Sequence, residues 1–352
     1  MHALKLGNAE FEGRNNAYLL DYPEEVTLID TGIATPEIDE QLRERLAEYD
    51  HEFDDIDTIV LTHWHPDHAG LAGAIQREGG ATIYVHEADA PLVRREEDAL
   101  EAMRALQVER FDEWGMPDEK RAALMDRLDG SDEIAGEPTT VETVADDDRI
   151  EVGDVELSVR HAPGHAAGLC CFEFDAGDSE APGSSISSEE LSDPENGSER
   201  ERGHGHGRLE AFVGDTILPV YTPNVGGADV RVDRPLERYL DTLETIVDRG
   251  YDRVWPGHRD VIDEPTERAQ FIIDHHRERA ERVLDTLDEH GPADPWAVSA
   301  HLFGELEGIH IMHGPGEAFA HLDHLERHGL VEETPDGYDL VDEAETSVEN
   351  VI

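Results

Sequence analysis

Three histidines and one aspartate fall within six positions of the stretch LTHWHPDHAG, residues 61–70. At the end of a strand, residues two apart project to the same side, so His63 and His65 can hold one metal ion together. Pro66 ends the strand and suits the first turn of a helix, which leaves Asp67 and His68 in a turn where they can hold a second ion. Imidazole and carboxylate donors without a thiolate suit Zn²⁺, and also Mn²⁺ or Fe²⁺.

Two metal ions need more than four ligands, so this interpretation requires further donors downstream, each at a strand end. The chain supplies His165 in HAPGHAAG, Asp215 in FVGDTI and His258 in VWPGHRD. Each follows an apolar stretch, and both histidines lie in Pro-Gly-His turns, whose glycine lets a backbone approach closely. Any one of them alone is more often an ordinary turn residue. Together, and in this order, they favour a metal site.

The elements that must position these residues alternate between strands and helices, which predicts sheets covered by helices. Strands are expected over residues 2–6, 16–22, 25–30, 57–62, 81–87, 143–165, 168–174, 210–215 and 251–258. Helices are expected over residues 36–49, 67–79, 88–130, 235–249, 266–290, 295–303 and 315–328, and Asp336-Gly337 marks a hairpin turn. The helical excursion over residues 88–130 either shapes a substrate entrance or is a plain surface helix pair.

Three regions follow from this pattern: a catalytic domain over residues 1–265, a connecting helix over 266–291, and a small winged-helix-like domain over 292–352. Residues 176–209 are polar and glycine-rich, so we expect a disordered acidic insertion at a hairpin tip. Its His204 and His206 could bind metal, although a solvated loop is the simpler interpretation.

Charge is the most unusual property of the composition. The 352 residues contain 84 acids and 28 bases, which leaves a net charge of −56. Such self-repulsion opposes compaction in ordinary buffer, but molar salt shortens the screening length to about 3 Å. We therefore expect a protein from an extreme halophile. A surface for a basic partner is the alternative, and the acids are spread through every segment rather than forming one block.

Cysteine content and hydropathy bear on the compartment. The two cysteines, Cys170 and Cys171, are neighbours that rarely bridge each other, so they are expected to pack within a strand in a reducing compartment. No apolar run is long enough to cross a bilayer, and the first residues do not resemble a leader peptide. These features predict a cytoplasmic protein without membrane contact.

The motifs NNAYLLD, VTLIDTG and THWHPDHAGLAG, with the three downstream residues, resemble the metallo-β-lactamase superfamily over roughly residues 10–262 outside the insertion. The resemblance implies an αββα sandwich, an α/β fold, with the site at one edge of its two sheets. It implies two Zn²⁺ ions: the first held by His63, His65 and His165, the second by Asp67, His68 and His258, with Asp215 bridging both. Asp30 would support a ligand loop, or simply form a turn.

In such a site, a hydroxide shared by the two ions is the expected nucleophile. Asp67 or a metal-bound water could carry the proton. Because His65 replaces a carboxylate at the second position of the motif, the di-iron oxygen-reducing branch of the superfamily is disfavoured.

The C-terminal region resembles hydrolases of the β-lactamase-like 2 type, some of which cut single-stranded RNA. Others of this outline are hydroxyacylglutathione hydrolases, although no convincing glutathione-binding set is present. The candidate reactions are those of a thioesterase, a lactonase or an endoribonuclease, on a small-molecule ester or thioester or on RNA, and a homodimer is allowed. The stretch GDTILPVYTPNVGG would place Tyr221 and Asn224 near substrate.

A different class remains open, a nucleic-acid-binding protein in which the winged module does the work. That module lacks a basic stripe, but charge is weaker evidence at molar salt. His321, His324 and His328 share one helix face, as an extra metal site or, more simply, as core or interface residues.

Overall fold

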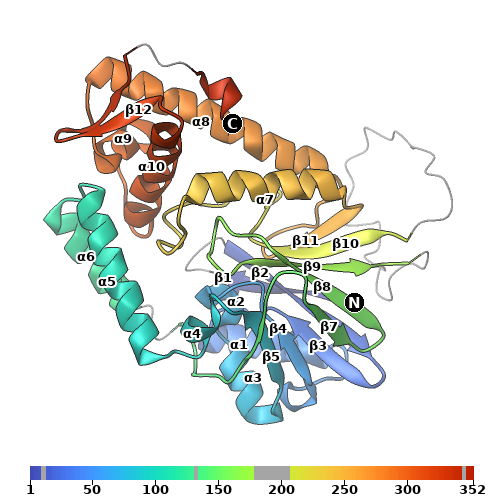
Figure 1. The fold of residues 1–352 in the computed structure, drawn as a ribbon. Coiled ribbons are helices and arrows are strands. Elements are labelled where there is room, and N and C mark those ends of the chain that lie inside the picture. The colour runs from blue at the N-terminus through green and yellow to red at the C-terminus, as the bar shows by residue number, and fades with distance from the viewer. Residues whose placement is uncertain (9–12, 131–133, 178–206, 343–345) are drawn as a thin grey trace.

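The structure is a computed structural model, and it describes residues 1–8, 13–130, 134–177, 207–342 and 346–352. Two β-sheets lie face to face, with helices on both outer surfaces (Figure 1). The strands of the first sheet are, in spatial order, β1 (His2–Asn8), β2 (Gly13–Tyr22), β3 (Glu25–Ile29), β4 (Thr58–Val60), β5 (Thr82–His86) and β6 (Glu142–Val144). Those of the second are β11 (Arg253–Pro256), β10 (Leu209–Gly214), β9 (Cys170–Asp175), β8 (Val155–His161) and β7 (Arg149–Val152).

Three apolar layers hold this sandwich together. The helices α1 (Pro36–Ala47), α2 (Pro66–Ala69) and α3 (Ala72–Gly79) lie on the side of the first sheet, and α1 and α3 bury side chains such as Leu42 and Ile75 against it. The middle layer lies between the sheets and contains Phe172 and Phe212. On the far side, α7 (Pro235–Arg249) and the first half of α8 (Pro265–His290) pack on the second sheet. The predicted four-layer αββα sandwich is confirmed.

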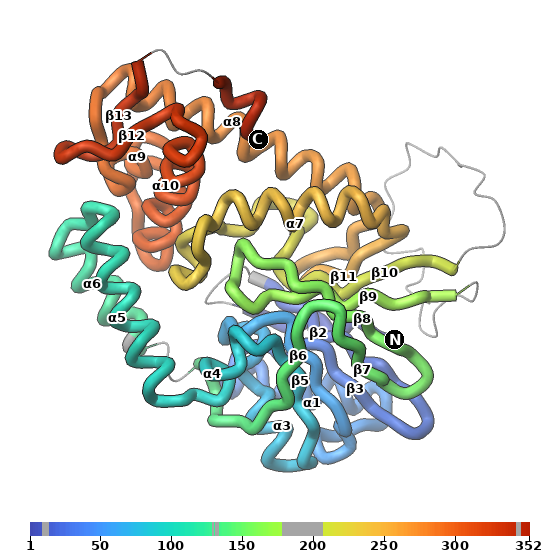
Figure 2. The backbone as a smooth tube through the Cα atoms, in the orientation of Figure 1, coloured from blue at the N-terminus to red at the C-terminus, as the bar shows by residue number. Residues whose placement is uncertain are grey.

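The excursion after β5 consists of α4 (Ala90–Val93), α5 (Glu97–Glu113) and α6 (Asp118–Gly130). Figure 2 shows α5 and α6 extending away from the sandwich toward α10 (His310–Arg327). Phe111 and Trp114 share an apolar cluster with Ile311 and Met312 of that helix. The excursion is therefore more than a plain surface helix pair, and its role at a substrate entrance stays a prediction.

The C-terminal part has the predicted order of two helices and a hairpin: α9 (Pro295–Phe303), α10 (His310–Arg327), β12 (Val331–Thr334) and β13 (Gly337–Leu340). The second half of α8 packs into this part through Ala280, Val283 and Leu287. Because the first half of α8 belongs to the core under the second sheet, this helix contributes to two cores and is more than a connector. The domain boundaries and the winged-helix assignment stay predictions.

Two helices differ from the prediction. The helix expected over residues 67–79 is interrupted between α2 and α3, because the amide of Leu71 donates to Gly32 O at 3.3 Å instead of continuing the helix. Helix α10 begins at His310 rather than at residue 315, with Pro315 inside it. Burial of Ile311 and Met312 favours this extension, although Pro315 has no N–H to donate to the carbonyl four residues earlier.

The insertion predicted over residues 176–209 is shorter at both ends, because the hairpin of β9 and β10 continues into it. Leu209 pairs with Asp175, and the amide of Ala176 donates to Arg208 O at 2.8 Å. His204 and His206 lie outside the described residues. Cys170 and Cys171 lie in β9 as expected, both buried with free thiols. Across the described parts of the chain, every helix is too short or too polar to span a bilayer.

We expect the inter-sheet layer to dominate the stability of the sandwich. The ring of Phe212, 1% exposed, lies 5.1 Å from the rings of both Tyr18 and Phe174. Phe212→Ala should lower the free energy of unfolding by about 3–5 kcal/mol, since it leaves a cavity between two sheets. Phe271→Ala, at a position 56% exposed, is the matched control and should cost about 0.5 kcal/mol or less. Denaturant titration in concentrated KCl measures both, and equal losses would contradict this view of the core.

Candidate metal centre

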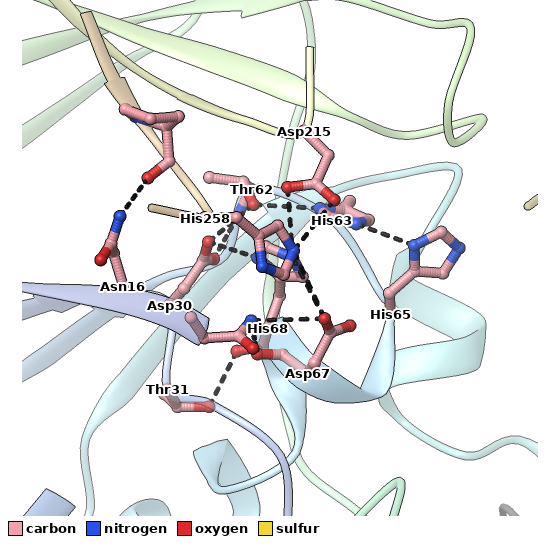
Figure 3. Close-up of polar contacts among 12 residues, drawn as sticks. Asn16, Asp30, Thr31, Thr62, His63, His65, Asp67, His68, Asp215 and His258 are labelled. Carbon is pink, nitrogen blue, oxygen red and sulfur yellow. Dashed lines mark hydrogen bonds and ion pairs between the residues drawn. The ribbon is translucent and has the colours of Figure 1, made fainter. Parts of the chain in front are cut away.

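The predicted ligands come from four separate loops and helix α2, and their ligand atoms lie close together. Figure 3 shows six of them side by side: His63, His65, Asp67, His68, Asp215 and His258. His63 and His65 follow β4, and Asp67 and His68 lie in α2. The other three follow strands β8, β10 and β11 of the second sheet. His65 is half-buried and the other six are buried: His63, Asp67, His68, His165, Asp215 and His258.

Three imidazole nitrogens form the first candidate metal position. His63 Nε2 lies 2.9 Å from His65 Nδ1, which lies 3.1 Å from His165 Nε2. In a tetrahedral zinc site with Zn–N bonds of about 2.0–2.1 Å, neighbouring nitrogens are separated by about 3.3 Å. The spacing of these atoms fits a small cation.

The second candidate position is formed by Asp67, His68 and His258. Asp67 Oδ2 lies 3.9 Å from His68 Nε2 and 3.5 Å from His258 Nε2. Asp215 lies between the two positions, with Oδ2 3.6 Å from His165 Nε2 and 3.2 Å from His258 Nε2. Its other oxygen, Oδ1, lies 3.5 Å from His68 Nε2. The structure therefore brings all seven predicted residues together.

Each of the five histidines has its remaining ring nitrogen against an oxygen. His68 Nδ1 lies 2.8 Å from Asp30 Oδ2, and His63 Nδ1 lies 3.1 Å from Thr62 Oγ1. The other three contact main-chain carbonyls: His258 Nδ1 with Arg14 O at 2.8 Å, His165 Nδ1 with Asn224 O at 2.9 Å, and His65 Nε2 with Ala228 O at 3.1 Å. Carbonyl and carboxylate oxygens only accept, and the Thr62 hydroxyl itself donates to Asp30. These nitrogens therefore carry the protons.

This pattern is a test of whether the site fits a metal. When the outer nitrogens of His63, His65 and His165 are protonated, their inner nitrogens point lone pairs at one another about 3 Å apart, which is favourable only around a cation. Three further inner atoms are buried without a hydrogen-bond partner: His68 Nε2, His258 Nε2 and Asp215 Oδ1. Gly257 leaves room for them, since a Cβ there would lie 2.5 Å from His68 and 2.7 Å from Asp215 Oδ1. The donor set fits metal ions at both positions.

Asp30 supports the ligand loop as well as forming a turn. It is 3% exposed, has a φ of 57°, and accepts hydrogen bonds at 2.8 Å from His68 Nδ1 and from the amide and the hydroxyl of Thr62. Both expected roles are therefore present in one residue. A carboxylate is suited to this role because it accepts several bonds and increases the basicity of the histidine.

Two sets of supporting residues were not identified from the sequence. Asn8 Nδ2 and Asn15 Nδ2 approach Asp67 Oδ2 at 3.1 and 3.3 Å, and Asn15 also donates to Asp67 O at 2.8 Å. The pair fixes the orientation of the carboxylate. In the sequence, the signal was Asn15, the first asparagine of NNAYLLD, and the motif does not reveal that Asp67 is its partner.

The second set is a buried ion cluster behind Trp64. The amide of Trp64 donates to Asp89 Oδ2 at 3.1 Å, and its indole nitrogen donates to Asp229 Oδ2 at 3.2 Å. Arg231 pairs with both aspartates, at 2.7 and 2.6 Å. Asp229 also accepts from the amide of Ala167, two residues after a ligand. The cluster therefore anchors both the His63–His65 segment and the loop of His165.

The two positions differ electrostatically. Burial lowers the pKa of His63 well below its usual range and that of His65 to about 3, and neighbouring imidazoles add to the effect. At the second position burial acts in the same direction, but nearby carboxylates outweigh it. They raise the pKa of His258 to about 9 and that of His68 well above its usual range. These imidazolium charges in turn outweigh the burial of Asp215 and hold its carboxyl pKa well below normal.

The remaining predicted residues have mixed outcomes. Asn224 does lie beside the metal ligands, but its Nδ2 donates to Glu317 and to His313 O. Tyr221 is half-buried, with Arg259 5.0 Å from the ring centroid. Substrate contact by Asn224 and Tyr221 stays a prediction.

The C-terminal histidines do not form one group. His321 is buried beside His276 and Glu317, and His324 Nε2 lies 2.9 Å from Val351 O. His328 is exposed. The first two are therefore core residues, as the simpler interpretation held, and the third is on the surface.

Comparison with known proteins agrees with this geometry. Residues 11–179 match the family model described as the metallo-beta-lactamase superfamily, and the chain therefore carries a domain of this superfamily. Asp215 and His258 lie beyond the matched residues, so their place rests on the geometry above.

Among curated proteins, a "Probable metallo-hydrolase" of Bacillus subtilis is 26% identical over 303 residues, which cover 86% of this chain and 84% of that protein. A "Beta-lactamase-like protein 2 homolog" of Drosophila melanogaster is 24% identical over 76% of this chain, and the match spans 66% of that protein. A metallo-beta-lactamase family protein from Thermus thermophilus superimposes with a TM-score of 0.77 and 27% identity, covering 97% of this chain and 98% of that one.

We expect Asp30→Ala to weaken metal binding at the second position by about 10–100-fold, because His68 loses the acceptor that orients it. The matched control is Asp50→Ala, since Asp50 also has a positive φ, 63°, but is exposed. Competition with a chromophoric chelator measures the affinity. Equal effects of the two substitutions would assign Asp30 to turn formation alone.

We expect a metal ion that binds at the second position to displace protons from its ligands. A metal ion that binds at the first position should displace none from His63 and His65. His68 and His258 have raised pKa values, so at pH 7 each holds a proton that a metal must displace. Affinity at that position should therefore rise with pH toward about 9, by about tenfold per pH unit for each proton displaced. Calorimetry of His165→Ala in buffers of different ionisation enthalpy measures the release. Heats independent of the buffer would contradict this prediction.

Proposed function

We propose that this chain, which carries a metallo-β-lactamase superfamily domain, is a dinuclear metal-dependent hydrolase of an ester, thioester or phosphodiester. The observation that supports this most is the convergence of seven candidate ligand side chains on two adjoining positions, with three inner atoms buried without a hydrogen bond. Burying so many imidazole and carboxylate groups in one place is costly, which is expected of residues that bind a metal rather than stabilise the fold.

The residues divide between two ions. His63, His65 and His165 would hold the first, Asp67, His68 and His258 the second, and Asp215 would contact both. Nitrogen and oxygen donors suit Zn²⁺, with Mn²⁺ or Fe²⁺ as alternatives. Metal ions bound there would act as Lewis acids toward the substrate oxygen. They would also lower the pKa of a water molecule, so that it could attack at neutral pH.

The chain itself would orient ligands and handle the proton. Asp67 is held by Asn8 and Asn15, and its pKa is lowered because the imidazolium charges of His68 and His258 outweigh its burial. An ionised, fixed carboxylate at this point can accept a proton from the attacking water, and we assign that role to Asp67.

A thiol nucleophile is disfavoured. Both cysteines are buried in β9, and burial raises the pKa of the Cys171 thiol to about 12. A thiolate is the reactive form of cysteine, so neither residue is suited to attack a substrate. This agrees with a mechanism in which water is the nucleophile.

The net negative charge of the chain bears on the salt concentration needed in assays. With 84 acids against 28 bases, we propose that the protein works in the cytoplasm of an extreme halophile and that metal and activity assays need concentrated KCl. A panel of thioesters, lactones and single-stranded RNA would distinguish the substrate classes.

We expect His65→Ala and Asp215→Ala to abolish hydrolysis of whichever substrate is active. Loss of a residue that only supports a ligand lowers activity by about 10–100-fold. Each of these two substitutions should lower kcat/KM by more than that. His301→Ala and Asp260→Ala, both at exposed positions, are matched controls that should retain activity. Metal analysis should give close to two ions per chain for the wild type. Full activity in either test variant, or only traces of metal in the wild type, would refute the proposal.

A further inference from the structure

A five-residue segment, Asn224 to Ala228, holds two of the three histidines of the first metal position. Its first carbonyl, Asn224 O, lies 2.9 Å from His165 Nδ1, and its last, Ala228 O, lies 3.1 Å from His65 Nε2. These contacts decide which nitrogen of each ring carries the proton and which faces the metal. Any displacement of this segment therefore changes two ligands together.

Helix α10 of the C-terminal part fixes this segment by hydrogen bonds. Asn224 Nδ2 donates to Glu317 Oε2 at 2.8 Å and to His313 O at 3.1 Å. Glu317 is 4% exposed, and its other oxygen accepts from Arg279 of α8 at 2.7 Å. A buried carboxylate held by an arginine is a rigid acceptor, because its alternative is an unpaired charge in the interior.

The backbones of the helix and the segment are also in direct contact. A Cβ on Gly316 would lie 2.3 Å from Gly227 Cα, and one on Gly227 would lie 2.7 Å from His313 Cα. Gly226 has a φ of 87°, and a Cβ there would lie 2.5 Å from Gly316 O. Glycines on both sides make this approach possible. The helix and the segment therefore pack backbone to backbone, with no room for a side chain between them.

We propose that α10 is a positioning element of the metal centre: through Glu317, Gly316 and the Asn224–Ala228 segment, the C-terminal helices set the affinity of the first metal position. The inference rests on the proposed function, and it goes further by making the C-terminal part a component of the site. None of these residues is among the seven candidate ligands, and the segment contacts the first metal position through His65 and His165, so we class them as positioning residues.

A third metal position at His276, Glu317 and His321 is the competing interpretation. Both oxygens of Glu317 already accept hydrogen bonds, and the Arg279 charge beside it opposes a second cation. His321 Nδ1 lies 2.8 Å from Glu317 O, so its Nε2 is free to accept from His276 Nδ1 at 3.2 Å. A hydrogen bond between two neutral imidazoles accounts for this pair, which leaves Glu317 to the segment.

The experiment measures Zn²⁺ affinity at each position separately, by competition with a chromophoric chelator in concentrated KCl. His258→Ala leaves the first position, and His165→Ala leaves the second. Into each background we place Gly316→Ala, which displaces the segment, or Asn224→Ala, which removes two hydrogen bonds without adding atoms. Gly314→Ala is the matched control, since the atoms nearest to its Cβ would belong to the Leu306 side chain, at 2.8 Å, and not to the segment. Circular dichroism verifies folding.

In the first background, both test variants should bind Zn²⁺ about 10–100-fold more weakly than the background alone, with the control unchanged. In the second background they should change affinity by less than about threefold. Unchanged affinity at the first position, or equal losses at both positions, would overturn the role of α10 and leave the proposed function intact. A His258→Ala protein that binds no Zn²⁺ would instead refute the proposed function itself.

Discussion

The metal centre depends on one constraint: a buried histidine can offer a lone pair inward only if the proton on its other nitrogen has an acceptor outside. Five histidines must meet this condition within one small volume. Their acceptors are one carboxylate, one hydroxyl and three main-chain carbonyls, drawn from four different segments of the chain. The requirement extends well beyond the ligands, and it explains why segments without any ligand, such as Asn224–Ala228, are held so closely.

The same constraint explains how charge is arranged in the interior. Asp30, Asp67 and Asp215 are all buried, and three carboxylates in one place would be costly without compensation. Positive charge on His68 and His258, whose pKa values are raised, provides it. A metal ion bound at the proposed second position would replace this positive charge rather than add to it. At the first position, burial lowers the pKa of His63 and His65 instead, so we expect the two positions to respond differently to pH although Asp215 lies between them.

Local patterns in the sequence predicted sheets covered by helices and the seven candidate ligand residues, because strands that end in a polar residue and glycine beside histidine are local features. The four-layer αββα arrangement followed instead from the resemblance to the metallo-β-lactamase superfamily. The sequence did not predict the contacts that orient those ligands. Asn15 approaches Asp67 and Arg231 pairs with Asp89 across large separations in the chain, and nothing local marks either pair. Helix α10 was predicted too short for a related reason. Its first turns are held by burial of Ile311 against α5 and α6, which depends on tertiary packing.

The division of the chain into a catalytic domain, a connecting helix and a C-terminal domain stays a prediction, and helix α8 contributes to the cores on both sides of it. Helix α8 packs Ile272 under the second sheet and Leu287 into the C-terminal core, so neither core is complete without it. Arg279, between these two residues, holds the carboxylate that orients Asn224. Because a rigid helix carries all three contacts, the C-terminal part cannot shift without disturbing both the sandwich and the first metal position. On this structure the C-terminal helices are better regarded as a wall of the metal centre than as a separate attachment.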